Sequence, residues 1–447
     1  MAAASTTAPS RPLVRLTWDR RAAVTTLTLV AWAVLLLVAR QWGKAILESG
    51  GVIRLASPPI VGWDEWTLDA RVVFPVVVAV AAVVAAPVLA RRLPWRWLLL
   101  GFFGLAALWA VSLALTMGMS GVLRPLVLRG DEYLLDVPRV GSPGPFLDHF
   151  VENVGRYVVH VNSHPPGFLL ILWTLDWIGL GGRGWAAVLC IGGGASTVPA
   201  VLIATKELAG EDAARRAAPF LALAPAAIWI ATTADAFFAG VGAWSACAVI
   251  IALRRTGRRS DVLALLGGIG FGVLLMLAYA LFLVGLIPFV LAVRERRIRP
   301  VLVAGVGAAA VLGVVALFGF WWPDGLSATG EQYRLSVAKD RSLRYFAVAN
   351  LAAFGIVLGP ALAVALVRLR DLRLWLVVGG ALLAVAIADV SNYSKGEVER
   401  IWLPFTVWVL AAGATLWRTD RVNVARAWLA LQVGFAILFE VAIKTRW

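Results

Sequence analysis

The sequence predicts an all-α polytopic membrane protein with about thirteen transmembrane helices. Of its 447 residues, 61% are hydrophobic and only 15% are charged, whereas a soluble domain is about half apolar and about a quarter charged. Apolar stretches recur along the whole chain, which excludes a single-pass receptor as well as a soluble globular protein. Both cysteines, Cys190 and Cys247, lie inside apolar stretches and are expected to pack in the core rather than form disulfides or metal sites.

The predicted spans follow the apolar runs in order. The run at 22–39 is too long for a signal peptide, and Arg40 follows it without a small-residue cleavage site, so we predict a first span there. The block at 262–293 is too long for one crossing and short for two, which predicts a helix pair broken near Tyr279. A shorter piece at 166–180 is expected to be re-entrant or interfacial. The other runs lie at 72–90, 97–117, 184–205, 216–231, 236–253, 301–321, 346–367, 372–390, 401–416 and 424–442.

The charged loops predict the orientation. With a cytoplasmic N-terminus, the loops on the inner side are short and rich in arginine, as the positive-inside rule requires. They contain Arg91, Arg92, Arg96, Arg215, Arg216, Arg254, Arg255, Arg258, Arg259, Arg294, Arg299, Arg368, Arg370, Arg373, Arg418, Arg421 and Arg426. This assignment requires 164–205 to make one net crossing. The net charge of +15 therefore indicates membrane topology and no nucleic-acid partner.

The opposite, outer side then receives four loops and the C-terminus. The loops lie at 41–71, 118–163, 322–345 and 391–400 and contain the acidic, aromatic and histidine residues. We expect three parts: an N-terminal three-span segment at 1–117, a membrane module at 118–416 with juxtamembrane helices on its outer surface, and a C-terminal span at 417–447.

All three histidines of the chain fall in the region 118–164, together with Asp131 and Glu132. Ionisable groups at the edge of the hydrocarbon layer are costly and tend to be functional, although a solvated loop also collects polar residues. His160 and His164 are four apart, which on a helix would suit a metal pair. The prolines that follow His164 disfavour a helix there, so zinc is not the preferred interpretation.

Three further features could bind an anion. His164, Pro165 and Pro166 open an apolar stretch, and a helix N-terminus beside His164 would suit a phosphate; the prolines could also merely begin a helix. Asp235 could line a site or cap the helix at 236–253. Lys395 and Arg400 precede a span and could hold a phosphate, or they could snorkel and pair with Glu397 and Glu399.

In these motifs the chain resembles the GT-C superfamily of integral-membrane glycosyltransferases, which includes protein O-mannosyltransferases and lipid A aminoarabinose transferases. The resemblance covers roughly 118–416. The composition, which is rich in Ala, Val and Leu and has far more Arg than Lys, is similar to that of actinobacterial members. The matching motifs are the acidic pair Asp131-Glu132, then His164-Pro165-Pro166, then Asp235, and finally Lys395 through Pro404. One departure is that three spans precede the acidic loop, so that Asp64-Glu65, after the first span, is a rival pair.

The resemblance implies an inverting enzyme at the outer face of the membrane. It would transfer a sugar from a polyprenyl-phosphate donor to a hydroxyl of a glycan, lipid or protein acceptor. Asp131 or Glu132 would be the general base, while the other orients it or binds a divalent metal; no other cofactor is expected. His164 and Asp235 would line the sugar-phosphate region, and Lys395 and Arg400, in a motif that includes Glu399, would bind the phosphate.

Two other classes of function stay open at this point. A secondary transporter or lipid-carrier flippase would show inverted repeats and ionisable residues near the membrane midplane. No convincing repeat is found, and the polar residues gather at one surface, which favours the enzyme. The third class is a non-catalytic subunit of envelope assembly, because a fold does not guarantee a function.

Overall fold

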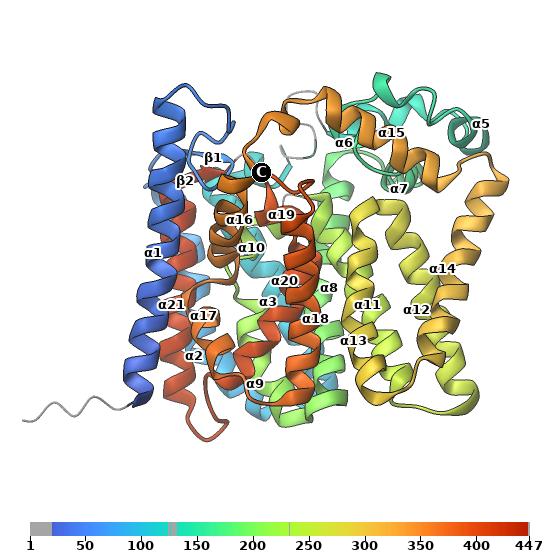
Figure 1. Ribbon diagram of the computed structural model, residues 1–447. Helices are drawn as coiled ribbons and strands as arrows, with labels where there is room; N and C mark the ends of the chain where they lie inside the picture. The colour runs from blue at the N-terminus through green and yellow to red at the C-terminus, as the bar shows by residue number, and fades with distance from the viewer. Residues whose placement is uncertain (1–19, 124–125, 127–131, 232, 446–447) are drawn as a thin grey trace, which may run out of the picture.

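The computed structural model describes residues 20–123, 126, 132–231 and 233–445 and confirms an all-α polytopic membrane protein (Figure 1). Within these residues, nine helices are long and apolar enough to cross a membrane, or ten if one bent pair is a single span. The nine are α1 (Arg20–Glu48), α2 (Val73–Arg92), α3 (Trp95–Ala114), α8 (Arg183–Ala209), α11 (Ala234–Leu253), α12 (Gly257–Leu277), α14 (Arg299–Leu317), α18 (Leu372–Val390) and α21 (Val422–Ala442).

The expected number of about thirteen continuous spans was too high, because several apolar runs form short helical pieces. They are α9 (Glu211–Ala222) with α10 (Ala227–Ile230), η7 (Tyr279–Gly285) with α13 (Leu286–Glu295), and α19 (Val398–Ile401) with α20 (Leu403–Val409) and η9 (Leu410–Thr415). Pro225 separates α9 from α10, and Pro404 lies at the start of α20. Proline lacks the backbone donor of a regular helix, and neighbouring helices must satisfy the freed groups.

Two breaks interrupt the apolar helices, and only one of them was predicted. The bent pair is α16 (Leu343–Leu358) and α17 (Pro360–Arg368), which meet at 96°. Gly359 between them has φ +80°, a conformation that favours glycine, and this bend was not predicted. The break near Tyr279 was predicted, and there α12 gives way to the 3₁₀ turns of η7.

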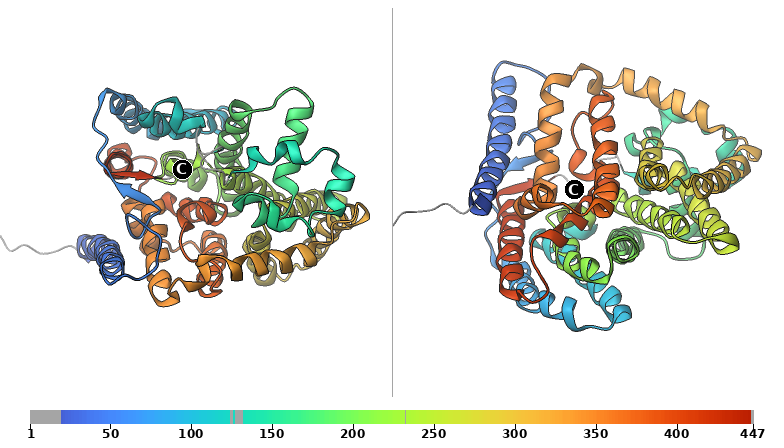
Figure 2. Two further views of the ribbon diagram at one scale, coloured as in Figure 1. Left: turned by 90° about the horizontal axis from the view of Figure 1, so that it is seen from above. Right: turned by 60° about the horizontal axis from the view of Figure 1, so that its bottom comes forward.

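Close packing at the centre of the bundle depends on small residues. On α11, a Cβ added to Gly240 would lie 2.4 Å from the carbonyl oxygen of Gly193 on α8. Between α12 and α14, a Cβ on Gly268 would lie 2.1 Å from the carbonyl oxygen of Ala304. Such close approach of backbones is typical of membrane helices. By contrast, α1 stands at the edge of the bundle, away from the segment 143–177 (Figure 2), and its most apolar window is only 6% buried.

Several short elements lie together at one end of the bundle, which we call the loop end (Figure 1). They are α5 (Pro143–Asp148), α6 (Val159–Asn162), α7 (Gly167–Trp177), α15 (Trp322–Leu335) and the strands β1 (Gly62–Asp64) and β2 (Ile443–Thr445). The strands pair antiparallel, with Gly62 opposite Thr445, so the C-terminal part of the chain lies beside the 41–71 loop. At 11 residues α7 is too short to cross a membrane, so within 164–205 only α8 has the length of a span.

The turns rich in arginine lie at the opposite end, which we call the arginine end. There Arg215 donates hydrogen bonds to the carbonyl oxygens of Ala90 at 2.8 Å and Leu93 at 2.9 Å, at the C-terminal end of α2. Arg297 likewise donates to the carbonyl oxygens of Leu253, the last residue of α11, and of Arg255, just beyond it. Arginines that cap helix C-termini in this way satisfy carbonyl groups and favour the helix dipole.

Candidate functional site

Ionisable side chains from separate parts of the chain converge near the loop end. Arg400 is at their centre: its Nη1 lies 2.6 Å from Asp235 Oδ2, and its Nη2 lies 2.5 Å from Glu397 Oε2. The same Nη2 lies 3.3 Å from His160 Nε2. On the other side of the imidazole ring, His160 Nδ1 lies 3.0 Å from Glu132 Oε2. These contacts form one continuous network from Glu132 to Glu397.

The network borders a small polar cavity. Glu132, Asp235, His160 and Arg400 are all buried, with exposed fractions between 4% and 9%. The cavity is lined by Glu132, Tyr133, His160, His164, Thr233, Ala234, Asp235, Phe238 and Arg400. Four residues named from the sequence, Glu132, His164, Asp235 and Arg400, are therefore brought together.

A buried amide holds the segment that carries Arg400. Asn350 on α16 donates hydrogen bonds to Asp389 Oδ1 at 2.9 Å and to the Ser394 carbonyl oxygen at 2.5 Å. Its own side-chain oxygen accepts from the Gly396 amide at 3.2 Å. Gly396 and Glu397 both have positive φ, at +94° and +61°, which is uncommon for a glutamate. This turn brings the Glu397 carboxylate back onto Arg400.

Asp235 does not cap its helix. The N-cap of α11 is Thr233, with an extended backbone, and the cap has no side-chain hydrogen bond. Asp235 instead lies in the first turn, where the helix dipole favours an anion, and its carboxylate binds Arg400, 165 residues away in sequence. The capping alternative is therefore wrong.

Glu132 and His160 are positioned by contacts around the 132–164 segment. Asp136, which is buried, accepts a hydrogen bond from the Val158 amide at 2.7 Å, just before α6 begins. The Tyr133 ring lies 5.9 Å from that of His160 and 6.0 Å from that of His164, measured between ring centroids. These contacts hold the histidines beside Glu132.

His164 lies differently from His160. Its Nδ1 is 3.1 Å from the carbonyl oxygen of Leu277, at the end of α12, so that Nδ1 carries a hydrogen and donates. Burial lowers the pKa of His164 to about 4, which keeps the ring neutral at neutral pH. The start of α7 is closely packed, since a Cβ on Gly167 would lie 2.3 Å from the Met276 carbonyl oxygen.

The charges of the cavity are strongly coupled. Burial alone would raise the pKa of Glu397, but the Arg400 charge and hydrogen bond hold this pKa below its usual value. Burial opposes the charge on Arg400, yet the Asp235 and Glu397 carboxylates raise its pKa. The guanidinium and the Glu397 carboxylate therefore stay ionised across the physiological pH range.

Two residues of the basic motif point elsewhere. Lys395 Nζ donates to the Lys339 carbonyl oxygen at 3.0 Å and lies 5.9 Å from the centre of the Tyr333 ring. Glu399 is fully buried and accepts a hydrogen bond from the Val61 amide at 3.3 Å. Lys395 thus contacts η8 (Val337–Asp340), and Glu399 contacts the 41–71 loop.

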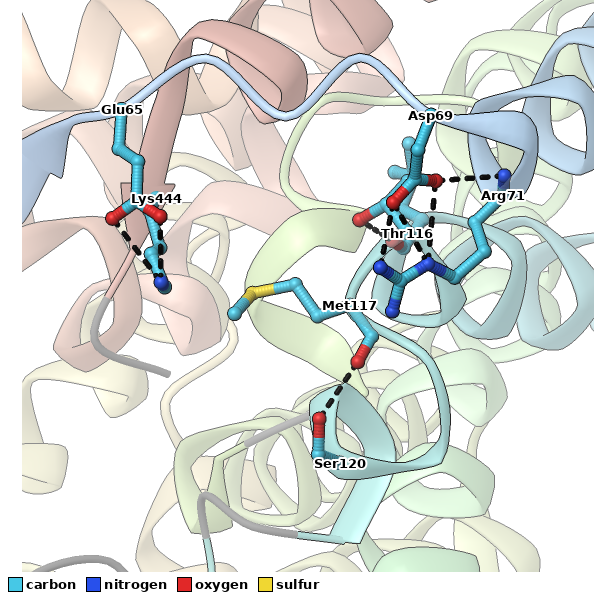
Figure 3. Close-up of polar contacts among 8 residues, drawn as sticks. Glu65, Asp69, Arg71, Thr116, Met117, Ser120 and Lys444 are labelled. Carbon is cyan, nitrogen blue, oxygen red and sulfur yellow. Dashed lines mark hydrogen bonds and ion pairs between the residues drawn. The ribbon is translucent and has the colours of Figure 1, made fainter.

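The acidic pairs have different surroundings. Asp131 lies outside the described residues, whereas Glu132 lines the cavity. Asp64 accepts from Arg40 at 2.6 Å, and Glu65 is 2.9 Å from Lys444, as Figure 3 shows for the second pair. The rival pair is therefore engaged in ion pairs beside the β1–β2 strands.

The described part of the chain contains no group of three or more His, Cys, Asp or Glu side chains that could hold a metal ion. The carboxylates of Asp235 and Glu397 are occupied by Arg400, and one oxygen of Glu132 is occupied by His160. These side chains, as they are placed, form an ion-pair network and do not form a metal centre.

An apolar groove lies between three membrane helices next to the cavity. It encloses about 820 Å³ of space that is open to the surroundings. Phe237 lines the groove, while the next residue, Phe238, lines the polar cavity. The groove is formed by Gly193 and Ser196 of α8, by Phe237, Gly240, Val241, Trp244, Ser245 and Ala248 of α11, and by Leu266, Gly267 and Gly270 of α12.

Sequence reasoning gave His160 no role beyond the disfavoured metal pair, and it gave Glu397 only a role in an internal salt bridge. The i, i+3 spacing of Glu397 and Arg400 is the one signal that pointed to a contact now observed. The contact of His160 with Arg400 joins residues 240 positions apart, and spacing along the sequence contains no signal for it.

Comparison with known proteins gives a distant likeness. No family model matches the chain, and no curated protein matches it. Among solved structures, it is similar to the crystal structure of the Archaeoglobus fulgidus oligosaccharyltransferase in complex with zinc and sulfate, with 15% identity and a TM-score of 0.41. The match covers 63% of this chain and 45% of the archaeal chain, so this protein spans less than half of that length. Nothing about activity follows from so distant a likeness.

Proposed function

We propose that the protein is a glycosyltransferase that moves a sugar from a polyprenyl-phosphate donor to a hydroxyl acceptor. The transfer would occur at the outer face of the cytoplasmic membrane and serve the assembly of an envelope glycan or glycoconjugate. One observation carries the proposal: two carboxylates, two histidines and an ion-paired arginine from distant segments line a single buried cavity near the loop end.

Glu132 is the candidate general base. Its carboxylate lines the cavity, and one of its oxygens is oriented by His160 at 3.0 Å. A base in this position would take the proton of the acceptor hydroxyl as the hydroxyl attacks the sugar. Asp131, its neighbour in sequence, is kept as a second candidate that orients Glu132 or binds a metal.

Arg400 is the candidate group for the departing phosphate. A fixed cation in a dry cavity stabilises developing negative charge without reorganisation. Asp235 and Glu397 would hold the guanidinium in place, and His164 would contact the donor as a neutral ring. For Lys395 and Glu399 we propose supporting roles, because they hold the Arg400 segment against η8 and the 41–71 loop.

The apolar groove supports a lipid-linked donor. Its lining is formed by helices that cross the membrane, and it begins at Phe237, two residues from Asp235. A polyprenyl chain in this groove would place its phosphate near the polar cavity. The substrates would then reach the site from the bilayer, which the apolar composition of the chain also favours.

A transporter or flippase remains the alternative. The bend of 96° between α16 and α17 is a feature that broken-helix transporters share. The ionisable cluster, however, lies near one end of the bundle, whereas transporters of that type bind substrate near the midplane. A non-catalytic subunit would have no need to keep the buried charges of the cavity at their cost in desolvation.

Membranes from a strain lacking this chain would test the proposal. They are incubated with radiolabelled polyprenyl-phosphate mannose or polyprenyl-phosphate arabinose, beside membranes that contain the chain. We expect one labelled product to vanish without the chain and to return with it. Identical products in both membranes, together with a changed distribution of labelled donor between the two leaflets, would instead support the flippase.

A further inference from the structure

Both ring nitrogens of His160 make contacts, one with the candidate base Glu132 and the other with the candidate phosphate-binding residue Arg400. Nδ1 is 3.0 Å from Glu132 Oε2, and Nε2 is 3.3 Å from Arg400 Nη2. The ring is buried, with 9% exposed.

The partners of His160 determine where its proton lies. An arginine guanidinium has donors only, so Nε2 can bond to Arg400 only as an unprotonated acceptor. In a neutral imidazole the other nitrogen, Nδ1, then carries the hydrogen and donates it to the Glu132 carboxylate. In a doubly protonated ring, the Nε2–H group would face the N–H groups of the guanidinium, and no hydrogen bond could form between these donors.

From this geometry we infer that His160 is a positioning residue, held as the neutral Nδ1–H tautomer, that orients Glu132 relative to Arg400. It fixes Glu132 Oε2 and leaves Oε1 as the oxygen that accepts the acceptor's proton. Because Arg400 in turn binds Asp235 and Glu397, the base and the cation are kept at a set separation. The effect on transfer rests on the proposed function; the protonation state does not.

The surroundings of His160 hold the ring in this orientation. α6, which carries His160, is held at its start by Asp136 through the Val158 amide. At its end, the Asn162 carbonyl oxygen accepts a hydrogen bond from Thr329 of α15 at 3.2 Å. The side of the ring contacts Tyr133. A ring held in this way can transmit a fixed orientation to Glu132.

Nitrogen NMR tests the tautomer without any substrate. The full-length protein, labelled with ¹⁵N in its histidine rings, is reconstituted in lipid nanodiscs at neutral pH. The chain has three histidines, so the signals that vanish in His160→Asn belong to residue 160. We expect a neutral ring with hydrogen on Nδ1. A neutral ring with hydrogen on Nε2, or an imidazolium, would overturn the inference.

Two substitutions then separate the two contacts during transfer. Asn at 160 retains a donor near the position of Nδ1, toward Glu132, whereas Gln reaches the position of Nε2 and retains only the contact with Arg400. We expect His160→Gln to lower kcat by roughly 10- to 100-fold, the effect of one hydrogen bond to a charged group. His160→Asn should lower kcat by less than about tenfold, and the donor KM should change little in both.

The exposed His149 supplies the matched control. It contacts its own helix through the Pro145 carbonyl oxygen, and His149→Gln should leave kcat and thermal stability as they are in the wild type. Equal losses of kcat in the Asn and Gln variants at residue 160 would show a merely structural residue and contradict the inference. If the wild-type chain transfers no sugar, the proposed function fails, while the ¹⁵N spectra still decide the tautomer.

Discussion

Arg400 is the residue that joins the segments of the candidate site. A buried guanidinium is costly to remove from water unless carboxylates pair with it. Asp235 and Glu397 supply two such partners, at 2.6 Å and 2.5 Å. The planar fork of donors lets one arginine bind several acceptors at fixed angles, which a lysine ammonium cannot reproduce. The geometry of the cavity therefore depends on an arginine at this position.

At the residue scale, the sequence could identify which polar groups lie at one end of the bundle but not which of them touch. Asp235 carried two interpretations, because an acid near a helix start suits both a cap and a site. Only the packing of α11 against α19 and α20 decides between them, since it brings Arg400 within reach. Lys395 and Arg400, five residues apart, were assigned one role, but the turn at Gly396 and Glu397 points them in different directions.

Glu399 predicts a pH dependence of stability. Burial, together with the nearby Glu397 charge, raises its pKa to about 7. Between the unfolded value near 4.5 and about 7, the folded state binds more protons than the unfolded state, so stability falls as pH rises through this window. The loss is complete above pH 7 and reaches up to about 3 kcal/mol.

Substitution of Glu399 by Gln tests this dependence. Gln at this position retains an acceptor for the Val61 amide and cannot ionise. We expect thermal unfolding of wild type and Glu399→Gln in detergent to agree near pH 5, with the variant unfolding at a higher temperature near pH 8. Parallel curves over the whole range would show that Glu399 does not titrate in this window.

At the scale of the elements, long uniform spans and the break near Tyr279 were predictable, whereas the bend between α16 and α17 was not. Apolar length and flanking arginines identified α2, α8, α11 and α21, because these signals lie within each run. The bend between α16 and α17 depends on Gly359 and on a hydrogen-bonded neighbour, Gln432, whose side chain donates to the Leu358 carbonyl and accepts from the Ala361 amide. Because the side chain that satisfies these backbone groups lies on a distant helix, the bend has no periodic pattern in the sequence around it.

The loop from α18 to α19 predicts a second effect. Asn350 holds it at Ser394 and Gly396 and also satisfies the buried Asp389. We expect Asn350→Ala to lower the free energy of unfolding by about 1–3 kcal/mol, because it leaves buried polar groups unpaired. It should also lower sugar transfer, since Glu397 would no longer be held on Arg400.

The measurement compares thermal unfolding and transfer by Asn350→Ala with those of Asn423→Ala. Asn423 is exposed at the arginine end and contacts Arg426, so its loss should change neither quantity. A stable Asn350→Ala variant with full transfer would show that the loop keeps its shape without the hydrogen bonds of Asn350.

At the scale of the whole molecule, charge separates the two ends of the bundle. The acidic and histidine residues of the candidate site lie at the loop end, and the helix-capping arginines lie at the arginine end. From the positive-inside rule we expect the arginine end to lie in the cytoplasm. This orientation would open the candidate site to the outer compartment, where a lipid-linked sugar would be used.

Single cysteines test the orientation, because both native cysteines are buried. Ser49 is exposed at the loop end and Arg258 is exposed at the arginine end. We expect a membrane-impermeant maleimide to label Ser49→Cys in intact cells and Arg258→Cys only after permeabilisation. The reverse pattern would place the candidate site in the cytoplasm and remove the proposed outer-face reaction.

The most direct test of the account measures transfer by the purified protein in vesicles that contain labelled polyprenyl-phosphate sugar and acceptor. Wild type is compared with Glu132→Gln and with Glu65→Gln, a matched change in the rival acidic pair that faces Lys444. We expect Glu132→Gln to reduce kcat by about 10²–10⁴-fold, as is typical for the loss of a general base. Glu65→Gln should transfer at the wild-type rate. Full transfer by Glu132→Gln, or a loss of transfer in Glu65→Gln alone, would show that Glu132 is not the general base.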